Sequence, residues 1–141
     1  MPELPGAGVK QNIGPGHPGS RLLPGFALIC AGLSGATGVV MSAVAAHAIE
    51  EGFISTAANM LLFHAGAFVA IGAYSALRRS LLLTLGFFLL AVGCALFSGD
   101  LLLRALAGMR AFPNAAPIGG SAMILGWIAV LFAGLVHLFR S

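Results

Sequence analysis

The stretch LLLTLGFFLLAVGCALFSGDLLL, residues 81–103, decides the fold of this 141-residue chain. It holds a single ionisable residue, Asp100. It is also long enough for a helix to cross the roughly 30 Å hydrocarbon core of a bilayer, which takes about 20 apolar residues. Three further stretches have the same character, and they cover residues 22–49, 56–77 and 118–139. The sequence therefore predicts an all-α integral membrane protein with four transmembrane helices.

The composition excludes a soluble globular domain. Hydrophobic residues make up 59% of the chain and charged residues 8%, so polar groups are too few to cover its surface in water. The net charge of +3 comes from seven Lys and Arg that are spread along the chain. We therefore expect no nucleic-acid-binding face.

Short connections between the apolar stretches predict an up-down-up-down bundle, whose transmembrane domain covers residues 22–141. Most basic residues then fall on one side of the membrane: Lys10, Arg21, Arg78, Arg79 and Arg140. The first connection, on the other side, carries Glu50 and Glu51. The positive-inside rule predicts that both termini face the cytoplasm.

Residues 1–21 precede the first apolar stretch and are rich in Gly and Pro. They lack the apolar core of a signal peptide, and they offer little apolar surface to offset the loss of chain entropy on folding. We expect them to form a cytoplasmic tail that becomes ordered only against a partner.

The first apolar stretch, residues 22–49, is rich in small residues that permit close helix packing. They form two stripes, one of Ala31, Gly35 and Ala43 and one of Ser34, Gly38, Ser42 and Ala46. A helix that is small on several faces is expected at the centre of a bundle, so the sequence places this helix there.

Polar residues gather in the half of the membrane opposite the termini, where we predict one polar cluster with a structural or ligand-binding role. Its members are His47, Asn59, His64, Ser98, Asp100, Gly119 and Gly120. An ionisable residue inside the membrane, such as His64, usually indicates a functional site. The structural alternative is a neutral His64 ring that forms a hydrogen bond with Ser98 or with a backbone carbonyl. Two partners are possible for the Asp100 carboxylate. It can form an ion pair with Arg104, or it can accept hydrogen bonds from the backbone N–H groups of Gly119 and Gly120 at the start of the fourth helix.

No stretch carries a catalytic set, a metal signature or a cofactor motif, so we expect no enzyme, no bound metal and no cofactor. Cys30 and Cys94 lie inside helices without a Cys-x-x-Cys spacing, which indicates small buried apolar residues. A haem between His47 and His64 is disfavoured, because their depths in the membrane differ and two axial ligands must meet at one iron.

Four ordered motifs resemble a known family of small membrane proteins, the domain of unknown function 423. They are AVAAHAI at 43–49, TAANMLLFHA at 56–65, LFSGDLL at 96–102 and APIGGSAMILGW at 116–127. The resemblance implies a four-helix protein of the bacterial inner membrane, with a eukaryotic relative and no established activity. The chain departs from the family where it has Val44-Ala45-Ala46 in place of Phe-Gly-Ala before the first histidine, and Asp100 in place of the serine of FSGS.

Two functional alternatives remain. The first is a non-enzymatic accessory or scaffold subunit, which suits a compact bundle with small connections and would contact the lipid bilayer and a membrane-protein partner or a second copy. The second is a small transporter or ligand-binding protein that uses the His and Asp residues of the polar cluster. Such proteins usually have broken helices around a hydrated cavity, and this sequence hardly shows them.

Overall fold

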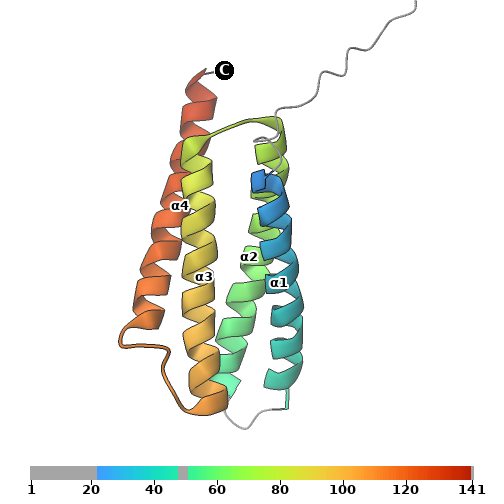
Figure 1. The fold of residues 1–141 in the computed structure, drawn as a ribbon, viewed down its shortest axis with the longest axis vertical. Helices are drawn as coiled ribbons and strands as arrows, with labels where there is room; N and C mark the ends of the chain where they lie inside the picture. The colour runs from blue at the N-terminus through green and yellow to red at the C-terminus, as the bar shows by residue number, and fades with distance from the viewer. Residues whose placement is uncertain (1–21, 48–50, 141) are drawn as a thin grey trace, which may run out of the picture.

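A computed structural model describes residues 22–47 and 51–140. Four helices make up this part of the chain, namely α1 (Leu22–Ala45), α2 (Glu51–Leu77), α3 (Leu81–Ala107) and α4 (Ala115–Arg140) (Figure 1). Each is long and apolar enough to cross a membrane. The prediction of an all-α membrane bundle with up-down-up-down helices is confirmed. The predicted tail, residues 1–21, lies outside the described residues.

Four helix boundaries differ from the prediction by several residues. Helix α1 ends at Ala45 instead of 49, α2 begins at Glu51 instead of 56, and α4 begins at Ala115 instead of 118. Helix α3 runs on from 103 to Ala107. An apolar run marks the length of helix that lies in hydrocarbon, whereas backbone hydrogen bonding continues into the more polar residues beyond it.

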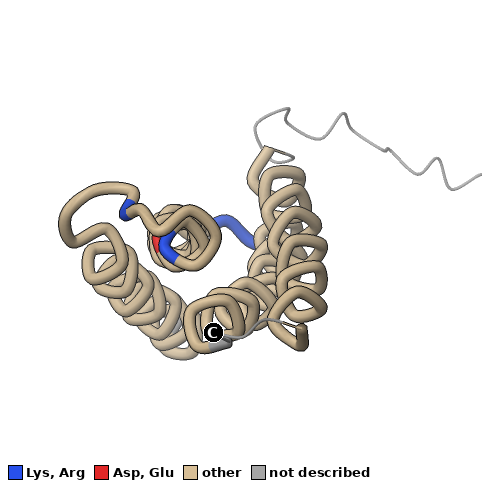
Figure 2. The backbone as a smooth tube through the Cα atoms, turned by 90° about the horizontal axis from the view of Figure 1, so that it is seen from below, with Lys and Arg blue, Asp and Glu red and all other residues tan. Residues whose placement is uncertain are grey.

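The helices form two antiparallel hairpins, in which α1 packs against α2 and α3 against α4. The hairpins meet mainly through α2 and α3, so α1 and α4 lie at the outside (Figure 2). The predicted central place of α1 is therefore wrong. Of the residues in the membrane-spanning stretch of α1, 17% are buried inside the protein, against 39% for the corresponding stretch of α3. One small face of α1 meets α2, and the opposite small face is left open.

Paired glycines bring α3 and α4 into backbone contact. A Cβ atom at Gly119 would lie 2.6 Å from the Phe97 nitrogen and 2.7 Å from the Gly93 oxygen. The pattern repeats seven residues earlier on α3 and seven residues later on α4, since a Cβ at Gly86 would lie 3.1 Å from the Gly126 oxygen. Only residues without a side chain allow this approach, which maximises dispersion contact where lipid gives no hydrophobic driving force.

The two ends of the bundle differ in the connections that they contain. We call one the Arg78 end, where α1 begins, α2 passes to α3 through Arg78–Arg79–Ser80, and α4 finishes. Ser80 caps α3 there, because its hydroxyl accepts the Leu83 N–H at 3.3 Å. The opposite one is the Asp100 end, where α3 finishes at Gly108 in the left-handed conformation (φ 65°).

Candidate functional site

His64 lies on α2 with its side chain buried in the bundle, at 5% exposure. Its Nδ1 atom is 2.8 Å from the carbonyl oxygen of Met60, one turn earlier. A carbonyl can only accept, so Nδ1 carries a hydrogen and donates it. In the neutral ring this leaves Nε2 as an acceptor. Within the described part of the chain that buried atom has no hydrogen-bond partner.

The surroundings of His64 join three helices. Its ring lies 6.2 Å from the ring of Phe68 on α2 and 6.0 Å from that of Trp127 on α4. The Met60 carbonyl that it bonds is also 3.8 Å from the Cys94 sulfur of α3. We call His64, Met60, Cys94 and Ser98 the His64 group, because Ser98 Oγ in turn lies 4.0 Å from Cys94 Sγ.

Sequence reasoning treated Cys94 as a plain apolar residue and so missed its place in the His64 group. Cys94 is 1% exposed, as expected for such a residue, but its thiol faces a carbonyl of the neighbouring helix. The signal that could have found it is the four-residue spacing to Ser98, which puts both side chains on one face of α3.

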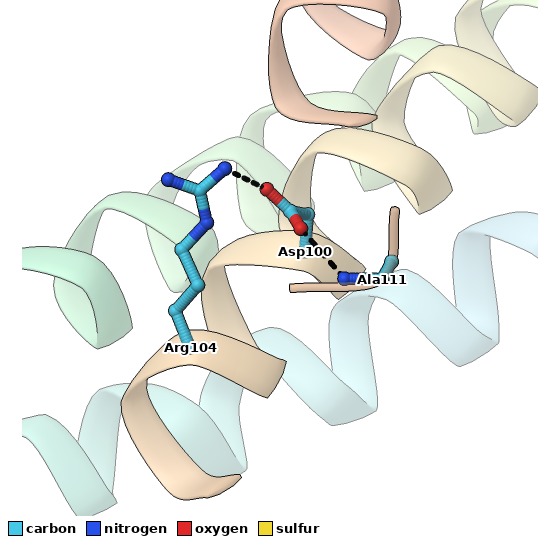
Figure 3. Close-up of polar contacts among 3 residues, drawn as sticks. All are labelled: Asp100, Arg104 and Ala111. Carbon is cyan, nitrogen blue, oxygen red and sulfur yellow. Dashed lines mark hydrogen bonds and ion pairs between the residues drawn. The ribbon is translucent and has the colours of Figure 1, made fainter. Parts of the chain in front are cut away.

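Asp100 lies on α3 with a fully buried side chain, about two turns before the helix ends. Its two carboxylate oxygens are used separately: Oδ2 pairs with the Arg104 guanidinium, and Oδ1 accepts the backbone N–H of Ala111 at 2.9 Å (Figure 3). The backbone N–H of Ala116, in the first turn of α4, also interacts with this carboxylate. We call Asp100, Arg104 and Ala111 the Asp100 clamp.

The Asp100 clamp ties the α3–α4 connection to the end of α3. Gly108 reverses the chain, and its N–H donates to the Arg104 carbonyl at 3.1 Å. The connection then passes directly over the carboxylate, so that Ala111 can donate to it. A carboxylate buried near the start of α4 is also favoured by the positive end of that helix dipole. The arrangement is suited to holding the two helices together.

The structure divides the predicted cluster of seven residues into separate parts. His64 and Ser98 belong to the His64 group, whereas Asp100 belongs to the clamp. Ser98 and Asp100 are two residues apart, so their side chains leave α3 on different faces. His47 and Asn59 are exposed, and within the described residues no hydrogen bond or ion pair joins them to either group.

The predicted donation from Gly119 and Gly120 to Asp100 is wrong. Helix α4 begins at Ala115, and Ile118 N–H already bonds to the Asn114 carbonyl. The N–H groups of Gly119 and Gly120 therefore lie past the open first turn and point to carbonyls of their own helix. The Arg104 alternative is the one that the structure shows. Gly119 serves helix packing instead.

Among the described residues, no three His, Cys, Asp or Glu side chains are grouped closely enough to hold a metal ion. The His64 group offers one imidazole nitrogen, one thiol and one hydroxyl, and the clamp offers a carboxylate that already has partners. The His64 group can therefore accept one hydrogen bond from a bound molecule, at Nε2 of His64.

The family model described as a protein of unknown function (DUF423) matches residues 41–120. The UPF0382 inner membrane protein YgdD of Escherichia coli strain K12 is 33% identical over 123 residues, covering 82% of this chain and 93% of that protein. A UPF0382 membrane protein of Haemophilus influenzae is 32% identical over 107 residues, covering 71% of this chain and 86% of that protein. No solved structure matches.

The chain therefore belongs to the DUF423 family, as its four motifs predicted. The names of these relatives place them in membranes and state no activity. The matched residues 41–120 include the His64 group, the Asp100 clamp and Gly119.

Proposed function

We propose that this chain is a non-enzymatic accessory or scaffold subunit of a larger complex in the bacterial inner membrane. The observation that carries the proposal is the open face of α1. This helix packs against α2 on one side and presents small residues on the other. A neighbouring membrane protein would bind there.

The open face of α1 carries four exposed small residues, with the exposed side chains of Ile29 and Val40 beside them. The small residues are Gly25, Gly32, Ala36 and Ala43. Their separations of 7, 11 and 18 residues from Gly25 are close to whole numbers of helical turns at 3.6 residues each, so they share one face. A Cβ atom added at Gly25 or Gly32 would meet nothing within 4 Å.

A row of small residues facing lipid gains nothing from the lipid itself. In a membrane, helices associate largely through close packing, and small residues separated by one turn permit it. The buried face of α1 already works in this way: a Cβ at Gly38 would lie 2.8 Å from the Leu62 side chain, and Ala27 packs over Gly72. The open face repeats the same chemistry without a partner among the described residues.

Filling the open face should release the partner and leave the bundle intact. We expect Gly32→Leu to abolish recovery of co-purifying protein from native membranes in mild detergent, while the thermal unfolding midpoint stays within a few degrees of that of the original chain. Gly66→Leu is the matched control, because Gly66 is also exposed with open space around it but lies on α2.

Recovery of no partner with the unaltered chain would refute the accessory role. Recovery of only a second, differently tagged copy would identify the partner as the chain itself. Equal recovery with Gly32→Leu and Gly66→Leu would remove α1 from the interface.

The alternative function is a small transporter or ligand-binding protein that uses His64 and Asp100. The buried and unpartnered Nε2 of His64 favours it, because such an atom costs free energy unless something bonds to it. Against it, both carboxylate oxygens of Asp100 are already occupied by protein groups. A chain recovered without a protein partner, and unchanged by Gly32→Leu, would favour this alternative.

We further infer that the Arg78 end faces the cytoplasm. Arg78 and Arg79 lie together in one connection at this end, and the positive-inside rule places such residues in the cytoplasm. The proposed interface on α1 crosses the whole membrane and does not depend on this orientation.

A further inference from the structure

An apolar groove lies between α2 and α4 in the half of the bundle nearer the Arg78 end. Its volume is about 280 Å³, and Tyr74 and His137 stand at one end with Trp127 at the other. Between them the walls are apolar, with Ile71, Val130 and Ala133 among the lining residues.

The groove has the length of one membrane leaflet. Trp127 and His137 are ten residues apart on α4, which is about 15 Å at the helical rise of 1.5 Å per residue. Half of a hydrocarbon core of roughly 30 Å is the same length. A single acyl chain that enters from the Arg78 end would therefore reach as far as Trp127.

A second hollow continues the groove at the Arg78 end. Its volume is about 400 Å³, and it shares Tyr74, Ala133 and His137 with the groove. Its other walls include Arg78, Arg79 and Ser80, from the α2–α3 connection. The two spaces thus form one site, with an apolar part in the membrane and a basic part at its surface. The rings of Tyr74 and His137 meet edge to face, 5.9 Å apart, where the two parts join.

Among the described residues, no Asp or Glu lines the basic part. Within residues 22–47 and 51–140 the one ion pair found is that of Asp100 with Arg104, at the far end of the bundle. Arg78 and Arg79 are exposed, and no acid among the described residues pairs with either of them. Guanidinium groups bind phosphate through paired N–H donors, and basic pockets between transmembrane helices bind anionic lipid head groups.

We propose that this site binds one anionic phospholipid. The phosphate lies against Arg78 and Arg79, and one acyl chain lies in the groove between α2 and α4 as far as Trp127. The charge of the hollow selects an anionic over a zwitterionic lipid, and the apolar groove selects a lipid over free phosphate. The site is separate from the open face of α1, so it does not rest on the proposed accessory role.

Trp127 is the chain's single tryptophan and lines the groove, so its fluorescence reports what lies there. The protein would be reconstituted in phosphatidylcholine vesicles that contain a small fraction of brominated phosphatidylglycerol or, separately, brominated phosphatidylcholine. Bromine in the acyl chain quenches tryptophan at contact. We expect half-maximal quenching at a mole fraction about 25-fold lower for phosphatidylglycerol, because each of the two basic residues near an anionic head group adds roughly fivefold.

Two variants and two controls test the parts of the site. The double variant Arg78→Gln and Arg79→Gln should give the same quenching curve for phosphatidylglycerol as for phosphatidylcholine. Arg110→Gln, in the α3–α4 connection, should leave the phosphatidylglycerol curve unchanged. Gly134→Leu should fill the groove and reduce quenching by both lipids, since Gly134 lines it with open space around it. Gly66→Leu, outside the groove, should not.

Equal quenching by the two lipids in the unaltered chain would overturn the proposal. So would a preference for phosphatidylglycerol that survives in the double arginine variant. Inorganic phosphate at millimolar concentration should not displace the lipid, and if it removed the preference completely the site would be one for free phosphate.

Discussion

Replacing Gly119 with alanine should lower the free energy of unfolding by about 2 to 3 kcal/mol, as expected when a tightly packed contact is overfilled. The added Cβ would lie 2.6 Å from the Phe97 nitrogen and 2.7 Å from the Gly93 oxygen. Both are backbone atoms of α3 and cannot turn away as a flexible side chain could. Helices α3 and α4 would have to separate along their length, and the contact between Gly86 and Gly126 would loosen with them.

The neighbouring glycine provides the control. A Cβ at Gly120 would meet only the Phe97 ring, at the ordinary contact distance of 3.9 Å. Gly120→Ala should therefore be neutral or stabilising by up to about 1 kcal/mol, because alanine is the better helix former. Unfolding of both variants in mixed detergent micelles, followed by circular dichroism, measures the difference. Equal stability of the two would contradict the account of α3–α4 packing.

Replacing Asp100 with alanine should lower the thermal unfolding midpoint by on the order of 10 °C, since it leaves a partly buried guanidinium and a backbone donor without their acceptor. The Arg104 side chain has 22% exposure, and its Nε already lacks a hydrogen-bond partner within the described residues. Without the carboxylate, the N–H of Ala111 also loses its bond, so the α3–α4 connection should open.

Hydrogen exchange at Ala111 distinguishes this local effect from a general loss of stability. In Asp100→Ala the Ala111 amide should exchange much faster, while amides in the middle of α2 keep their protection. Asp100→Asn should fall between, because its amide oxygen can still accept the Ala111 N–H. The control is Ser121→Ala, whose exposed hydroxyl bonds only to the Pro117 carbonyl of its own helix. An unchanged Ala111 amide in Asp100→Ala would remove the clamp from the account.

The four helices could be predicted because apolar length alone determines whether a segment can cross a bilayer, and residues 81–103 satisfy that condition without reference to any other part of the chain. The position of α1 at the outside of the bundle could not be predicted from the sequence. Small residues on two faces show that close packing is possible on both, but they do not say whether the second neighbour is within the same chain. In the structure, α1 packs against α2 along one face and makes only slight contact with α3.

The polar residues were predicted to form a single cluster, and the structure divides them into separate parts. Depth along the membrane follows from counting residues, but a contact also depends on which way each side chain points. Ser98 and Asp100 lie at nearly the same depth in the membrane but have different partners. Ser98 lies near Cys94, whereas Asp100 bonds to the α3–α4 connection. The donor to Asp100 was missed because Ala111 contributes only its backbone, which residue type does not reveal.

The central claim, that a neighbouring membrane protein packs on the open face of α1, is tested most directly by photo-crosslinking in native membranes. A photoreactive amino acid at Ala36, in the middle of that face, should give an adduct with one protein of defined mass. The same residue at Leu131, which is 60% exposed on α4, should give lipid adducts. Lipid adducts alone at Ala36 would contradict the account.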